Sequence, residues 1–71
     1  SSTRRATPGQ ILAVHVSPGE KVERGSRLVT LEAMKMEHTL TAASAATVST
    51  VDCQPGQRVQ DGAVLLRLDP A

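Results

Sequence analysis

The second half of the chain repeats the first, and this repeat restricts the fold more than any other feature of the sequence. The segment that begins at Val48 aligns with the segment that begins at Ile11, a shift of 37 residues. Self-similarity at a fixed spacing is the signature of a duplicated structural unit. We therefore interpret the chain as two copies of one unit. Seven of 22 aligned positions are identical: Val14/Val51, Pro18/Pro55, Gly19/Gly56, Val22/Val59, Gly25/Gly62, Leu28/Leu65 and Leu31/Leu68.

Each copy reads as two short strands connected through turns. Runs rich in Val, Ile, Leu and Thr and bounded by Pro and Gly are typical of β-strands. "SPGE" at 17–20 and "QPGQ" at 54–57 predict type II turns, because Pro presets the first central residue and Gly accepts the positive φ of the second. "TPGQ" at 7–10 predicts a third turn of the same kind.

The first strand of each copy carries an irregularity. In a regular strand the side chains that face the core occupy every second position. Positions 11, 14 and 16 are apolar in the first copy, so the pattern changes parity between 11 and 14. We predict a β-bulge or bend at this point.

The two copies are expected to pack against each other, because neither can bury its apolar face alone. The predicted fold is all-β, a flattened sandwich or barrel of two small antiparallel sheets related by an approximate two-fold axis. We assign residues 1–71 to a single domain, with repeat one at about 3–32, an exposed hairpin at 33–39 and repeat two at about 40–69. The symmetry mate of the hairpin is the place where the chain begins and ends. The hairpin and the termini should therefore lie at opposite ends of the domain.

The composition limits the core and the partners. Phe, Tyr and Trp are absent, so small aliphatic side chains must fill a narrow interior, and 71 residues leave no room for an enzyme cleft. Eight basic and seven acidic residues are spread without blocks, which argues against nucleic acid or an anionic membrane as a partner. No apolar run approaches the roughly 18 residues needed to span a bilayer. A single cysteine forms no internal disulfide, which fits the cytoplasm or, in a eukaryote, the mitochondrial matrix.

The connection between the copies contains "EAMKME" at 32–37. These residues favour a helix, but a helix of about eight residues is marginal in water without a docked apolar face. Because strand-like segments flank it on both sides, we predict a hairpin with Met34, Lys35 and Met36 at or beside the tip. Lys35 would then project into solvent from a short, well-held turn. The two methionines would form a surface that other proteins grip or, on a plainer interpretation, fill gaps in the core.

These residues carry a resemblance to a known family. "EAMKMEH" at 32–38 resembles the biotin-attachment signature of the biotinyl carrier domains of biotin-dependent carboxylases, whose centre is Ala-Met-Lys-Met. The likeness extends to "PGE" in the first copy and "CQPGQRVQDG" in the second, and it covers nearly the whole chain. It implies a biotin cofactor joined by an amide to the side chain of Lys35. The residues it places around the attachment point are Met34 and Met36 for recognition, with Ala33, Glu32 and Glu37 as the motif context.

The resemblance also implies a place in a larger enzyme. The ending "LLRLDPA" is similar to the C-terminus of the biotin-carrying subunits of acyl-CoA carboxylases, especially the methylcrotonyl and propionyl types, so we expect the C-terminal piece of a longer chain. Pyruvate carboxylases and urea amidolyases are similar as well and stay as alternatives. Such a domain has no catalytic residue and no metal of its own. A biotin protein ligase attaches the cofactor, and the domain shuttles activated CO2 between biotin carboxylase and carboxyltransferase sites. The assembled carboxylase is of the ligase class and uses ATP and bicarbonate.

Two other functions share part of this pattern. A lipoyl carrier domain of a 2-oxo-acid dehydrogenase or glycine cleavage complex has the same fold and a hairpin lysine, but Asp usually precedes that lysine and methionines do not flank it. An unmodified scaffold module, as in efflux adaptor proteins, carries long helical hairpins at this position. Met34 and Met36 therefore favour biotin.

Glu32 and Glu37 lie on either side of the expected tip. Two carboxylates could form a general acid–base pair, but nothing in a chain of this size forms a cleft around them. We interpret them as solubilising charges that also contact the ligase.

The remaining reactive side chains are assigned structural roles. His15 and His38 lack the spacing of metal ligands, so we interpret them as surface or hydrogen-bonded residues. Lys21, the other lysine, follows a turn and is a solvated charge. Cys53 takes the position that Val16 fills in the first copy, so it is a buried small hydrophobe rather than a nucleophile.

Overall fold

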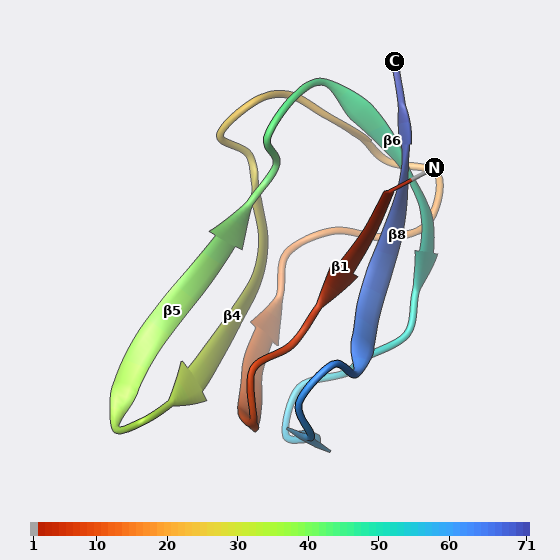
Figure 1. Ribbon diagram of the computed structural model, residues 1–71. Coiled ribbons are helices and arrows are strands. Elements are labelled where there is room, and N and C mark those ends of the chain that lie inside the picture. The colour runs from red at the N-terminus through yellow and green to blue at the C-terminus, as the bar shows by residue number, and fades with distance from the viewer. Residues whose placement is uncertain (1) are drawn as a thin grey trace.

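The computed structural model describes residues 2–71, and these residues form two four-stranded antiparallel sheets (Figure 1). No helix occurs within this range, so the predicted all-β sandwich is confirmed. One sheet has the order β1-β8-β6-β3 and the other β5-β4-β2-β7. The strands are β1 (Ser2–Arg5), β2 (Gly9–Val14), β3 (Lys21–Val22), β4 (Arg27–Ala33), β5 (Met36–Thr41), β6 (Ala46–Val51), β7 (Arg58–Val59) and β8 (Val64–Pro70).

The two sheets are related residue by residue. β2 pairs with β4 and β6 pairs with β8, and a shift of 37 converts the pair Gln10↔Glu32 into Thr47↔Asp69. The edge strands β1 and β5 correspond through a shift of 36 instead. Thr30 and Arg67 are repeat mates at the shift of 37. Their partners on the edge strands are Thr39 and Thr3, which are 36 positions apart. The connection after β5 is one residue longer than the connection after β1. This extra residue accounts for the difference between the shifts of 36 and 37.

Four tight turns with a glycine in the third position repeat in the same way. The turn at 17–20 closes with a hydrogen bond from Glu20 N to Ser17 O of 3.1 Å, and Gly19 has a φ of 88°. Its mate at 54–57 closes at 3.2 Å, with Gly56 at 87°. Both predicted type II turns are confirmed. Gly25 and Gly62 occupy the same place in a second related pair, at 87° and 81°.

The turn expected at 7–10 is wrong. Gly9 opens β2 and does not have a positive φ, so no type II turn forms there. A β-carbon at this position would collide with the backbone carbonyl oxygen of Glu32. Glycine is needed here because two strands approach closely and not because a turn needs its φ.

The bulge predicted in the first strand is confirmed. The register of β2 against β4 shifts between Ile11 and Ala13, and the register of β6 against β8 shifts between Val48 and Thr50. Each bulge adds one residue and so restores apolar side chains to the core side of the strand.

The core lies between the sheets and consists of small side chains. Fifteen apolar residues are buried, and no charged or polar side chain is buried among residues 2–71. The largest of the fully buried side chains are Ile11, Leu28, Leu31, Leu65, Leu66, Val29 and Val48. A sandwich with no aromatic residue is narrow, and the molecule measures 33 × 18 × 17 Å.

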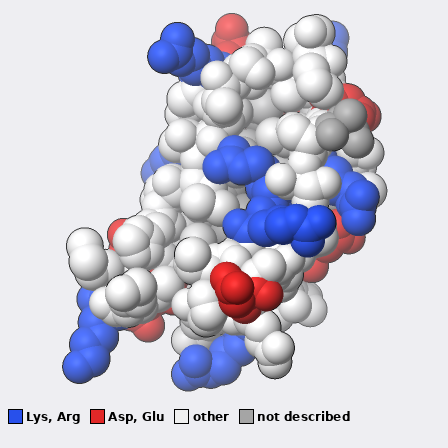
Figure 2. All heavy atoms as spheres, in the orientation of Figure 1, with Lys and Arg blue, Asp and Glu red and all other residues white. Residues whose placement is uncertain are grey.

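The hairpin of β4 and β5 and the ends of the chain lie at opposite ends of the molecule. Figure 1 shows the hairpin tip at the lower left, while β1 starts and β8 finishes at the upper right. On the face shown in Figure 2, Lys and Arg are spread along the length of the molecule with acidic groups between them. Residues 2–71 contain no helix long and apolar enough to cross a membrane.

Candidate functional site

A two-residue turn closes the hairpin of β4 and β5. Ala33 and Met36 pair across the ladder, so only Met34 and Lys35 lie in the turn. Their φ angles are 54° and 63°, both in the left-handed region. Two left-handed residues in a two-residue hairpin define a type I′ turn, which normally takes Asn and Gly. Here both positions hold large side chains, at about 1–2 kcal/mol of backbone strain each.

The six paired rungs of the hairpin hold this strained turn in place. The rung next to the tip contains Ala33, which is 4% exposed and packs into the core. A β-carbon built on Gly9 would approach the β-carbon of Ala33 to 3.1 Å, so β2 passes close beneath the tip. Ala33 therefore anchors the turn to the core. Local strain persists where the surrounding structure fixes it in this way, and such strain concentrates at functional sites.

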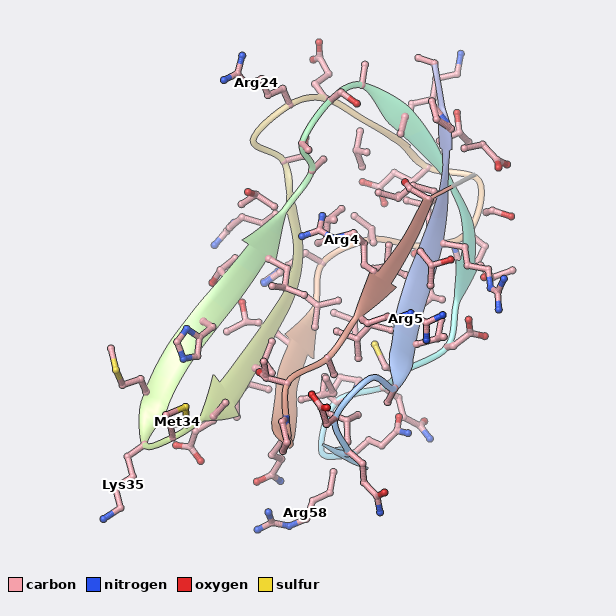
Figure 3. All side chains as sticks on the ribbon, in the orientation of Figure 1. Arg4, Arg5, Arg24, Met34, Lys35 and Arg58 are labelled. Carbon is pink, nitrogen blue, oxygen red and sulfur yellow. The ribbon has the colours of Figure 1, made fainter. Side chains whose placement is uncertain are left out.

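The turn presents one amine between two exposed methionines. Met34 is 89% exposed and Met36 is 62% exposed, so neither fills a gap in the core. Lys35 is exposed and points away from the body of the domain (Figure 3). A thioether side chain that is freely exposed is poorly placed for stability and well placed for contact with another protein.

Two carboxylates lie next to the turn. Glu32 on β4 and Glu37 on β5 pair directly across the ladder, and both are exposed. Because both side chains are exposed, neither carboxylate is desolvated. The pair places negative charge in the second rung from the turn that holds Lys35.

The two histidines are not part of the turn. His15 Nε2 is 2.8 Å from Thr30 Oγ1, which in turn is 3.1 Å from Thr39 Oγ1, so this histidine belongs to a hydrogen-bonded row on the sheet. His38 is exposed on β5. No group of three or more His, Cys, Asp or Glu residues that could hold a metal is found within the described range, 2–71.

Cys53 is half-buried and packs against the core. Burial, with a smaller contribution from the negative charge of Asp52, raises the pKa of its thiol. A thiol with a raised pKa is a poor nucleophile at neutral pH. This environment agrees with the interpretation of Cys53 as a small hydrophobe.

The sequence did not reveal a groove beside the hairpin. We call it the tip groove; its volume is about 240 Å³, and it lies between the segment 5–7 and the hairpin. Leu31, Ala33 and Leu40 form its buried or half-buried lining, and Met34 belongs to its exposed lining. The segment and the hairpin are far apart in sequence, so only the packing of the sheets brings them together.

A comparison with models of protein families identifies the family of this chain. Residues 3–68 match the family model described as biotin-requiring enzyme. The chain belongs to the family of biotin-requiring enzymes. Biotin is thus the cofactor of this family, as the motif at 32–38 predicts.

Known relatives of this biotin-requiring domain are parts of carboxylases. The chain is 41% identical over 69 residues to the mitochondrial propionyl-CoA carboxylase alpha chain of Homo sapiens. The aligned region covers 97% of this chain and 10% of that protein. The chain is 45% identical over 60 residues to the biotin carboxyl carrier protein of acetyl-CoA carboxylase of Solanum lycopersicum, covering 84% of this chain and 86% of that protein. The chain spans about a tenth of the human relative's length.

A solved structure is also similar to this chain and is also a carboxylase. A single-chain, multi-domain long-chain acyl-CoA carboxylase superposes with a TM-score of 0.89 at 37% identity, covering 99% of this chain and 7% of that one. The predictions of a biotin carrier domain and of its fold are confirmed. The lipoyl alternative has less support. A lipoyl domain of a 2-oxoglutarate dehydrogenase complex superposes with a TM-score of 0.86 but at 23% identity, so it shows the fold alone, whereas the carboxylase proteins match at 37–45% identity.

Proposed function

We propose that Lys35 is the residue to which biotin is joined, and that this domain carries biotin for an acyl-CoA carboxylase. The observation that carries the proposal is the placement of Lys35 in a two-residue turn, exposed and between two exposed methionines, at the tip of the β4–β5 hairpin. Lys21, the other lysine, lies in the two-residue edge strand β3 without such a turn.

The residues of the tip fit an amide-linked cofactor. Attachment is acyl transfer: the nitrogen of Lys35 attacks the activated carboxyl carbon of biotin, a C–N bond forms, and the leaving group departs with its electron pair. Attack requires the lone pair of the neutral amine, and the ligase supplies the base that takes the proton released by the reaction. The amide is neutral, so attachment removes one positive charge from the tip.

Biotin supplies a ring that holds CO2 in activated form, and the domain supplies position. Because the tip and the chain ends lie at opposite ends of a 33 Å molecule, a tether at the ends leaves the tip free to enter other active sites. A tethered carrier meets those sites at a high effective concentration that depends on the linker.

Partners and location follow from the relatives. The human relative is named a mitochondrial propionyl-CoA carboxylase alpha chain, and the superposed structure is a long-chain acyl-CoA carboxylase. We therefore propose that the partners are a biotin protein ligase and the biotin carboxylase and carboxyltransferase parts of an acyl-CoA carboxylase. The matching compartment is the cytoplasm or, in a eukaryote, the mitochondrial matrix.

The proposal is tested by intact mass after co-expression with a biotin protein ligase. The chain should gain the mass of one biotin less one water. Lys35→Arg should gain nothing and keep its fold by circular dichroism, while the matched control Lys21→Arg should be labelled like the wild type. Label that persists in Lys35→Arg, or disappears only in Lys21→Arg, would refute the assignment. A mass increase that corresponds to lipoate would instead favour the lipoyl alternative.

A further inference from the structure

The tip groove has a symmetry mate at the other end of the domain. We call the mate the terminal groove; its volume is about 160 Å³, and Leu68 and Pro70 line it where Leu31 and Ala33 line the tip groove. The edge elements correspond as well, with Thr7 matched by Ala43, His38 by Ser2 and Leu40 by Arg4. The duplicated fold therefore makes one groove at each end. Differences in lining between the two grooves come from their side chains and not from the fold.

The tip groove is the larger and more apolar of the two. Where the tip groove has Leu40, the terminal groove has Arg4, whose Nη1 donates a 2.7 Å hydrogen bond to Thr41 O. Where the tip groove has the ring of His38, the terminal groove has the small hydroxyl of Ser2. The tip groove is also bordered by Met34, the residue bonded to Lys35. The larger and more apolar of the two grooves thus lies at the end that presents the amine.

We propose that the tip groove is a resting site for the biotin arm of Lys35. This inference rests on the proposed function. Because Met34 borders the groove and is covalently bonded to Lys35, any group on that amine is held close to the groove at high effective concentration. A weak intrinsic affinity therefore suffices to dock the arm between transfers.

The lining fits the chemistry of biotin. Leu31, Ala33 and Leu40 offer apolar surface to an alkyl chain and a thioether ring. At the exposed rim, His38 offers a ring nitrogen to the ureido group of biotin. Arg5 also lines the groove, but its Nη1 donates to Gly62 O at 2.9 Å and its guanidinium lies over β8, away from the hairpin (Figure 3).

Docking has to be reversible. Lys35 points away from the body of the domain (Figure 3), so the arm reaches the groove only by folding back over Met34. A flexible methionine can move to cover or release it. The docked arm would be shielded from water in transit, and the extended arm would enter a partner's active site.

Nuclear Overhauser effects in the biotinylated 71-residue chain test the proposal. Cross-peaks are expected between biotin ring protons and the methyl groups of Leu31, Ala33 and Leu40, with none to Leu68 in the terminal groove. Cross-peaks to Met34 and Met36 alone would overturn it. Intact mass on the same sample separates this failure from failure of the proposed function, since biotin present without the cross-peaks removes only the resting site.

Variants built from the symmetry provide the controls. Leu40→Arg introduces the residue that the terminal groove has at the matching position, Arg4, so we expect the variant to fold. It should abolish the cross-peaks while biotin remains attached. Thr7→Trp fills the tip groove from an exposed position and should do the same. Ala43→Trp makes the matched change in the terminal groove and should leave the cross-peaks unchanged. Cross-peaks that survive both tip-groove variants would contradict the proposal.

Discussion

Glu32 and Glu37 face each other directly across the β4–β5 ladder, in the second rung from the turn that presents Lys35. Like charges in directly opposed positions destabilise an antiparallel pair. Both carboxylates are exposed, so packing does not require them. We therefore expect the pair to lower the stability of the hairpin.

Replacing one member of the pair should stabilise the domain. Glu37→Gln removes the repulsion, and we expect its melting temperature to rise by a few degrees in low salt. The gain should shrink in high salt, because the charges are exposed and screened. Glu23→Gln, an exposed change outside the hairpin, is the control. A melting temperature that does not differ from that of the control in low salt would show that the pair is not repulsive.

The strained turn predicts a second stabilising change. Met34 has a φ of 54° and is 89% exposed, so Met34→Asn relieves backbone strain and loses little buried surface. Asn tolerates the left-handed region, and we expect a gain of about 1 kcal/mol in the free energy of unfolding, or about 4–8 °C in Tm. Met34→Val, which is β-branched, should lower Tm. If both variants melt like the wild type, the turn is not strained.

Two glycines should respond differently to alanine. At Gly9 a β-carbon meets the backbone carbonyl of Glu32, which cannot move aside without parting β2 from β4. We expect Gly9→Ala to lower the free energy of unfolding by about 1–3 kcal/mol and to speed hydrogen exchange in those strands. The β-carbon of Gly19→Ala would have open space around it, so we expect only the strain of the positive φ, about 1–2 kcal/mol. Hydrogen exchange in β2 and β4 should stay normal in this variant. Normal exchange in Gly9→Ala would contradict the close approach.

The thiol of Cys53 predicts a pH dependence. Burial raises its folded-state pKa, so the folded chain keeps the thiol proton to a higher pH than the unfolded chain does. The resulting stability is fully present below the ordinary thiol pKa and is lost as the pH rises through the raised value. Cys53→Val copies Val16 of the first copy and removes this titration. Urea melts should therefore show that the wild type loses more stability than the variant in the alkaline range; equal losses would mean that the thiol is not shifted.

Much of the fold could be predicted from the sequence because the chain repeats. The change of parity between Ile11 and Val14 located the bulge, and the Pro-Gly pairs located two turns, since each signal depends only on neighbouring residues. Pro8-Gly9 was misread because the same dipeptide serves a different purpose there. Whether a glycine provides φ or clearance depends on what packs above it, which no local pattern records.

The attachment turn could be predicted, but its conformation could not. The strand-like flanks of 32–37 indicated a hairpin, and the structure places the turn at Met34 and Lys35. Neither residue favours a left-handed φ, so the type I′ geometry comes from the pairing of the strands. The tip groove had no sequence signal, because segment 5–7 reaches the hairpin only through the packing of two sheets.

The most direct test of the account exchanges the two residues of the turn. Met34→Lys combined with Lys35→Met keeps composition, mass and charge but moves the amine by one position in a turn whose two side chains project differently. With a biotin protein ligase in vitro, the wild type should be labelled to completion while the exchanged variant is labelled at least tenfold more slowly. Equal initial rates, measured by intact mass, would contradict the claim that the ligase depends on where this turn holds the amine.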